Sequence, residues 1–222
     1  MAMEGFSEFD FQIGELNGRF EVDRKYGFEQ RITMKQYEWA REYMRINKNI
    51  GQRGAGDGTP HAQFMGKLGE VVVADALGIE LALKSEGMDK GKDIVFGNLI
   101  IDVKCKTRRY QILGFYGWNV YAAQFDNPNF EANCYVFAGI NDWHKEEMVK
   151  ENPWVFMMAG WITRVAFGKR SYWLPAGTKR LRSDGKFFME EGYEIPNYET
   201  TTDSLFPLHG WEDLKDKRKA IL

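Results

Sequence analysis

The sequence predicts one domain of the α/β or α+β class, and three observations lead to this expectation. First, the chain has 222 residues, of which 44% are hydrophobic, and no shift in composition divides it, so one substantial core is expected. Second, residues 33–48 and 60–78 place apolar side chains at helical spacing. Third, apolar runs typical of strands occur at 93–106, 134–140 and 154–162.

The N-terminal part, residues 1–50, is expected to hold a β-hairpin and one helix. In the hairpin, apolar and polar residues alternate on both sides of Asn17-Gly18. This dipeptide favours a two-residue turn because both of its residues tolerate positive φ. The helix runs from Thr33 to Lys48 and combines an apolar stripe with a basic edge.

A second helix is predicted from Pro60 to Gly78, after a glycine-rich loop at residues 51–58. Thr59 supplies the N-cap and Pro60 the first helical position, and Gly78 is placed to end the helix. The helix is apolar on two sides, which indicates burial, and Glu70 lies between those sides.

Two glycines inside this helix, Gly66 and Gly69, predict a close approach to a neighbouring sheet. Each glycine lowers helix propensity by about 1 kcal/mol relative to alanine. Close packing against a strand is therefore expected to offset that loss.

A tight hairpin is predicted for residues 93–106, with a two-residue turn at Gly97-Asn98. This turn fixes the register and places Asp93 opposite Asp102. Directly opposed β positions hold their Cβ atoms about 4.5 to 5.5 Å apart, where like charges repel. Either both carboxylates are solvated, or one is protonated, or a cation lies between them.

Lys104 and Glu70 complete the candidate site. Lys104 lies two residues beyond Asp102 and projects from the same face of the strand, whereas Val103 points to the other face. A carboxylate on an apolar helix face, such as Glu70, is costly to bury without a metal or a positive partner. Three acids and a lysine could therefore surround one Mg²⁺ or Mn²⁺ ion. Such an ion activates water and neutralises charge on a phosphodiester, so the pattern predicts hydrolysis of nucleic acid.

These residues resemble the core of the PD-(D/E)XK nuclease superfamily, whose fold is a mixed central β-sheet flanked by helices, as in restriction endonucleases. The resemblance is carried by "GKLGE", "GKD" and "IIDVK", with eight residues between the two aspartates. It covers roughly residues 62–106, and Lys92 stands where the family name has proline. The later segments "MMAGWITRVAF" and "GYEIPNY" loosely resemble nucleases encoded by bacteriophages.

The resemblance implies a role for each residue of the site. Asp93 and Asp102 would bind Mg²⁺, which Mn²⁺ can replace, and Val103 would add its backbone carbonyl. Glu70 would complete the metal shell directly or through water. Lys104 would handle the water that attacks the phosphodiester. By this resemblance the catalytic residues are Glu70, Asp93, Asp102 and Lys104.

Residues 1–222 are accordingly expected to form a single nuclease domain that cleaves DNA, with an endonuclease favoured. Its core spans about 60–170, and an acidic, irregular tail covers about 184–222. A recombination exonuclease or a junction resolvase is an alternative within the enzyme class, because the sequence does not separate these modes of cutting. Gln111 falls where some exonucleases carry Gln-xxx-Tyr, but residue 115 is Phe. A non-catalytic DNA-binding or scaffolding protein on the same fold is the alternative from another class. The sequence also leaves a homo-oligomer open.

Positive charge is distributed unevenly, although the formal net charge is only −2. Residues 103–125 and 164–182 contain basic side chains and no acid, and both tracts contain aromatic residues. The first helix adds its basic edge. Candidate contacts to the DNA backbone are therefore Lys106, Arg108, Arg109, Arg41, Arg45, Lys169 and Arg170.

Composition also favours a soluble, cytoplasmic location, and the resemblance to bacteriophage nucleases implies action inside a bacterial host. Cys105 and Cys134 lack the spacing of a zinc site or of a disulfide framework. No apolar run is long enough for a membrane-spanning helix. The segment "YQILGFYGWNVYAAQ" is consistent with either a helix or a pair of strands.

Overall fold

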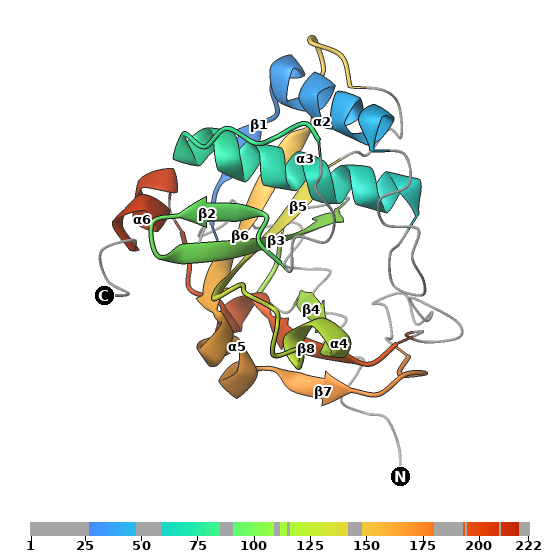
Figure 1. The fold of residues 1–222 in the computed structure, drawn as a ribbon, viewed down its shortest axis with the longest axis vertical. Coiled ribbons are helices and arrows are strands. Elements are labelled where there is room, and N and C mark those ends of the chain that lie inside the picture. The colour runs from blue at the N-terminus through green and yellow to red at the C-terminus, as the bar shows by residue number, and fades with distance from the viewer. Residues whose placement is uncertain are drawn as a thin grey trace, which may run out of the picture.

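The computed structural model describes the chain over residues 27–47, 59–84, 91–108, 112–114, 116–141, 148–179, 193, 195–208 and 210–217. The predicted hairpin around Asn17-Gly18 and the glycine-rich loop at 51–58 lie outside the described residues. Within them, the protein is of the α+β class, with one five-stranded mixed sheet, one three-stranded sheet and five α-helices (Figure 1).

The five-stranded sheet contains the predicted hairpin. Its strand order is β1 (Glu29–Arg31), β6 (Val155–Thr163), β5 (Cys134–Asn141), β3 (Leu99–Thr107) and β2 (Ile94–Phe96). Strands β3 and β5 run parallel, and the other neighbours are antiparallel. The second sheet has the order β4 (Gly117–Tyr121), β8 (Asn197–Thr201) and β7 (Tyr172–Leu174). The predicted mixed sheet is therefore present, and a second sheet accompanies it.

The helices lie on both sides of the larger sheet. They are α2 (Met34–Ile46), α3 (Pro60–Leu77), α4 (Ala122–Phe125), α5 (Arg164–Arg170) and α6 (Trp211–Lys217), with a 3-10 turn η1 at Thr202–Ser204. Figure 1 shows α3 lying across one side of the sheet beneath α2, with β4, β7 and β8 on the other side. Within the described residues, no helix has the length and apolar character needed to cross a bilayer.

The two predicted helices are confirmed, and local signals in the sequence explain their ends. Thr33 forms a capping box with Gln36 at the start of α2, which ends at Ile46. Thr59 accepts a hydrogen bond from the first turn of α3, and Gly78 ends that helix with a φ of 72°. A left-handed residue at this position is normally glycine because it lacks a Cβ atom.

Two hydrophobic cores lie on opposite faces of the five-stranded sheet. The helix-side core packs between the sheet and α3, and the inter-sheet core packs between the sheet, β4 and α5. Side chains of β5 alternate between them, as the strand period of two requires. Cys134, Val136, Ala138 and Ile140 join the helix-side core, and Tyr135 and Phe137 join the inter-sheet core.

The prediction that two glycines bring α3 close to the sheet is confirmed for Gly69 only. A Cβ atom at Gly69 would lie 2.6 Å from the Cβ atom of Cys105 on β3, whereas nothing lies within 4 Å of one at Gly66. Of these two glycines, only Gly69 therefore lies against β3.

We expect opposite effects from alanine at these two positions. Gly69→Ala should lower the free energy of unfolding by about 1 to 3 kcal/mol, because the new methyl group overlaps Cys105. Gly66→Ala should raise it by about 1 kcal/mol, because alanine favours the helix and meets no neighbour. Urea denaturation of both variants measures the difference, and equal effects would contradict the close approach at Gly69.

The described part of the predicted irregular tail, residues 193, 195–208 and 210–217, contains a strand and a helix, which corrects the prediction for that part. Strand β8 lies in the middle of the second sheet, between β4 and β7, and α6 follows it. Glu199 on β8 is only 1% exposed and accepts hydrogen bonds from the hydroxyl groups of Tyr172 (2.7 Å) and Tyr193 (3.1 Å). An acidic residue of the tail is thus buried with two tyrosine partners, one on β7 and one six residues before it.

The segment "YQILGFYGWNVYAAQ", left open between helix and strands, contains one of each. Residues 117–121 of the segment form β4, and residues 122–124 begin the short helix α4. Trp118 of β4 is fully buried and donates a hydrogen bond from its indole nitrogen to Oγ1 of Thr202 at 2.8 Å. This segment therefore belongs to the second sheet and faces the larger one.

Candidate active site

The hairpin that carries the two candidate aspartates has the predicted register. Ile94 pairs with Ile101, and Gly97 adopts a φ of 61° in the turn. The ladder stops one pair short of Asp93 and Asp102, since β2 begins at Ile94. The predicted face-to-face pair of carboxylates is therefore not part of the ladder, because Asp93 lies just before the strand.

Asp93 binds the backbone of the neighbouring strand instead. Its Oδ2 accepts a hydrogen bond from the amide of Val103 at 2.7 Å. The carboxylate thus continues the contact between the two segments beyond their last backbone pair. It is held beside Val103, the residue whose carbonyl the family resemblance assigns to the metal shell.

Asp102 is a buried carboxylate that faces the inter-sheet side. It is only 3% exposed, and the ammonium of Lys104 lies 2.8 Å from its Oδ2. By distance this contact is an ion pair, but no described residue donates to Oδ2 with hydrogen-bond geometry. We therefore treat it as a Coulombic contact that leaves the oxygen unsatisfied. A buried anionic oxygen of this kind strongly favours a second positive partner.

Lys104 also contacts the short helix α4. Its Nζ donates a hydrogen bond to Oε1 of Gln124 at 3.2 Å, and its side chain is 21% exposed. The predicted same-face arrangement of Asp102 and Lys104 is confirmed by their contact. Gln124 was not predicted, because it lies twenty residues from Lys104 on an element that the sequence left undecided.

Glu70 is paired with Lys67, one turn away on α3. The two side chains form a buried ion pair, with side-chain exposures of 16% for Lys67 and 12% for Glu70. Burial lowers the pKa of Lys67, but the charge and hydrogen bond of Glu70 and the charge of Asp93 together raise it above its ordinary value. The Lys67 ammonium also lies 4.4 Å from the ring centre of Tyr43.

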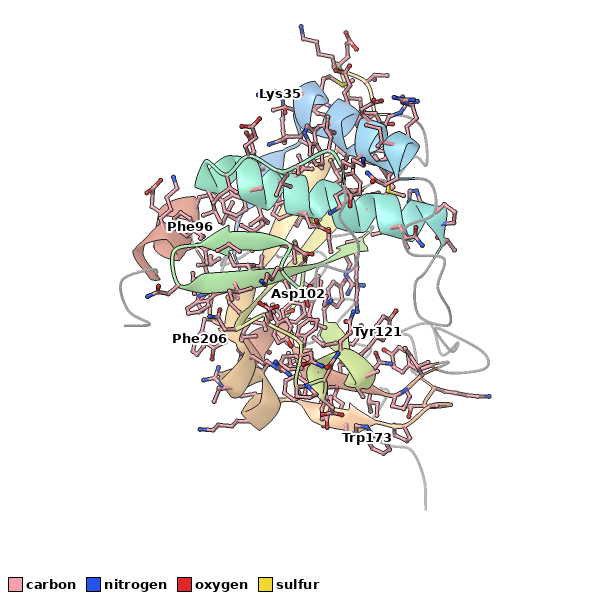
Figure 2. The ribbon with its side chains drawn as sticks, viewed as in Figure 1. Lys35, Phe96, Asp102, Tyr121, Trp173 and Phe206 are labelled. Atoms are coloured by element: carbon pink, nitrogen blue, oxygen red, sulfur yellow. The ribbon has the colours of Figure 1, made fainter. Side chains whose placement is uncertain are left out.

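The predicted acids therefore occur in two neighbouring groups. In the first group, Lys67 interacts with the charges of both Glu70 and Asp93. In the second, Lys104 contacts Asp102 and donates a hydrogen bond to Gln124. Figure 2 shows Asp102 below α3 and above the second sheet. Among the residues that the structure describes, no three His, Cys, Asp or Glu side chains form a cluster suited to a metal. The predicted shell of three carboxylates is thus not preassembled there.

A smaller shell still fits the residues present. Mg²⁺ commonly binds through one or two carboxylates and keeps several waters. The unsatisfied Oδ2 of Asp102 and the carboxylate of Asp93 supply donors of this type. Metal binding by Asp93 and Asp102 stays a prediction. Glu70 is not counted in this shell because it is paired with Lys67.

Comparisons with protein-family models, curated proteins and solved structures give no match.

The basic residues of β3 and of the segment after it face the second sheet. Lys106 donates a hydrogen bond to Oδ1 of Asn119, and Arg108 lies 4.9 Å from the ring of Trp118 and 5.1 Å from that of Tyr116. Burial lowers the pKa of Arg108. From the sequence, both residues were candidate DNA contacts, and nothing in it showed that β4 lies against them.

The other predicted DNA contacts are exposed, except Arg109, which lies outside the described residues. Arg45 forms an ion pair with Glu42 on its own helix at 2.6 Å. Arg170 donates a hydrogen bond to the carbonyl oxygen of Ser204 at 2.7 Å. Arg41 and Lys169 are exposed on α2 and α5. These four residues lie on helices at opposite sides of the larger sheet.

Proposed function

We propose that the chain is a metal-dependent deoxyribonuclease of the PD-(D/E)XK type, with a restriction-endonuclease-like core and endonucleolytic cutting. The observation that supports this most strongly is the buried Asp102 carboxylate, which has an unsatisfied oxygen and an ammonium group 2.8 Å away. A buried oxygen in this state can accept a metal ion or a metal-bound water, which is what a hydrolytic site needs.

Each residue of the site has a defined task in this proposal. Asp102 and Asp93 hold the ion, with the Val103 carbonyl as a further ligand. A bound Mg²⁺ ion supplies an activated water and neutralises charge on the phosphodiester. Lys104 positions the attacking water, and Gln124 orients the Lys104 ammonium through the bond at 3.2 Å. Glu70 joins the shell only through water, because Lys67 already pairs with it.

The distribution of exposed positive charge supports DNA as the substrate. Arg41, Lys169 and Arg170 are exposed and suited to phosphate contacts. In contrast, Lys106 and Arg108 brace the two sheets against each other through Asn119 and Trp118. We assign these two residues to the support of the site rather than to the surface that meets DNA.

Incubation of circular, linear and branched DNA with the purified protein tests the proposal. We expect cleavage with Mg²⁺ or Mn²⁺ and none with EDTA. Nicked or linearised circles indicate an endonuclease, mononucleotides from linear DNA an exonuclease, and cuts at the branch a junction resolvase. Intact DNA of every kind in both metals would contradict the proposal.

A non-catalytic DNA-binding or scaffolding protein is the second candidate. The pairing of Glu70 with Lys67, which removes one acid from the predicted shell, favours it. DNA binding that is unaffected by metal, together with intact substrates, would support this candidate. Sedimentation of the protein with and without DNA would show whether a homo-oligomer forms in either case.

Replacing Gln124 by alanine is expected to slow cleavage by about tenfold, the usual effect of losing a residue that orients a group in the site. The reason is that the Lys104 ammonium loses its acceptor on α4. The measurement is the single-turnover rate at saturating Mg²⁺. Gln36→Ala is the matched control, because Gln36 bonds Asp75 between α2 and α3, away from Lys104. An unchanged rate in Gln124→Ala would exclude a role for the amide.

A further inference from the structure

Tyr135 is a buried residue of the inter-sheet core that sequence reasoning did not single out. It lies on β5 and pairs directly with Asp102 of the parallel strand β3. Registered residues on neighbouring strands point to the same face of a sheet, about 4.8 Å apart along the hydrogen-bonding direction. The phenol and the carboxylate therefore share one face and one environment.

Both side chains carry a buried polar atom for which no described residue is a hydrogen-bond partner. Tyr135 is 0% exposed, and no described residue forms a hydrogen bond with its hydroxyl group. The same holds for Oδ2 of Asp102. Buried polar groups in proteins are nearly always bonded, either to protein or to internal water. Because the two atoms without hydrogen bonds belong to paired residues, a single bridging group can account for both.

We propose that Tyr135 is a positioning residue for Asp102, and that its hydroxyl group donates to an internal water which in turn donates to Oδ2. The ammonium of Lys104, 2.8 Å from that oxygen, lies where it can donate to the same water. Such a site has three polar partners, within the range that internal waters have. The bridge fixes the rotamer of the Asp102 carboxylate.

The surroundings of Tyr135 hold its ring in place for this task. Its ring centre lies 5.2 Å from that of Phe167 and 6.1 Å from that of Phe137. Nearby, Arg164 donates to the carbonyl oxygens of Phe130 (2.7 Å) and Asn127 (3.2 Å), which fixes the segment after α4. The hydroxyl group thus sits on a rigid ring, as a positioning role requires.

The first test is a double-mutant cycle in thermal unfolding without divalent metal. Tyr135→Phe is expected to lower the Tm by about 2 to 4 °C in the wild-type background, the shift typical of losing one bridging bond at this chain length. In the Asp102→Ala background the same change should have little effect. If Tyr135→Phe raises the Tm, or has the same effect in both backgrounds, the inference is overturned.

The second test uses Mn²⁺ as the probe and rests on the proposed function. Tyr135→Phe is expected to raise the Mn²⁺ concentration for half-maximal stabilisation by about tenfold, the usual loss when a ligand-orienting partner is removed. Tyr37→Phe, the same change at a tyrosine of the helix-side core, should leave it unchanged. Equal Mn²⁺ curves for the wild type and Tyr135→Phe would overturn the inference. A wild type that binds no Mn²⁺ and cleaves no DNA contradicts the proposed function, and the double-mutant cycle then decides the role of Tyr135 alone.

Discussion

Replacing Asp102 by asparagine is expected to lower Mg²⁺-dependent DNA cleavage by at least about 100-fold, as loss of a central electrostatic group does. Asparagine keeps the shape of the side chain but removes the negative charge that faces Lys104 at 2.8 Å. The measurement is the cleavage rate under single-turnover conditions, with circular dichroism to confirm the fold. A variant that cleaves as fast as the wild type would remove Asp102 from the site.

Asp203→Asn provides the matched control. Asp203 lies on η1 and is exposed, so the same chemical change there should leave cleavage unaltered. A comparable loss in this variant would show that the effect of Asp102→Asn is not specific to the site.

The proposed metal binding by Asp102 can be measured independently of cleavage. A ligand that binds only the folded state stabilises it by about 2.7 kcal/mol at a concentration of one hundred times its Kd. Mg²⁺ or Mn²⁺ should therefore raise the Tm of the wild type, and should raise that of Asp102→Asn much less. Equal shifts in both proteins would place the metal elsewhere.

The largest effect on stability is expected at Trp118. Trp118→Ala should lower the free energy of unfolding by about 3 to 5 kcal/mol, as truncation of a fully buried aromatic residue does. The indole is 0% exposed, bonds Thr202 and packs against Phe137 at 5.7 Å. It also lies beneath the guanidinium of Arg108. The measurement is urea denaturation.

Trp173 on β7 provides the control for this prediction. It belongs to the same sheet but is 54% exposed, so Trp173→Ala should change the free energy of unfolding by no more than about 0.5 kcal/mol. If the two variants lose similar stability, then burial between the sheets does not account for the effect at Trp118.

Elements that carry their own local signals were predictable from the sequence. The caps at Thr33 and Thr59 and the glycine at Gly78 define α2 and α3 within a few residues. The dipeptide Gly97-Asn98 fixes the register of β2 and β3. In each case the residues that determine the structure lie within one turn of it, so no knowledge of distant contacts is needed.

The second sheet was not predictable because its strands are short and lie far apart in the chain. Trp118 and Thr202, which hydrogen-bond across it, are separated by 84 residues. The tail was predicted to be acidic and irregular, but Glu199 lies on a strand and is buried with Tyr172 and Tyr193 as partners. Secondary-structure propensity and charge are properties of the segment alone. The burial of β8 depends on its neighbours β4 and β7, which come from earlier parts of the chain.

The candidate site was predictable in part, for the same reason. Period two placed Lys104 on the face of Asp102, and the structure confirms their contact. The strand period could not show that Gln124 contacts Lys104 or that Tyr135 pairs with Asp102. Both residues belong to later elements, whose positions beside β3 depend on the tertiary fold. The sequence indicated that Glu70 requires a metal or a positive partner, and Lys67 on the same helix is the partner observed.

The central place of β8 in its sheet has a consequence for how the protein is made. Chains emerge from the ribosome N-terminus first and fold as their segments are released. The acidic hairpin is complete at residue 107, but β4 and β7 meet only through β8, which ends at Thr201. A nascent chain would therefore carry its acidic pair long before the second sheet can close over Lys104. Any task that needs the second sheet beside Lys104 would then wait until β8 has left the ribosome.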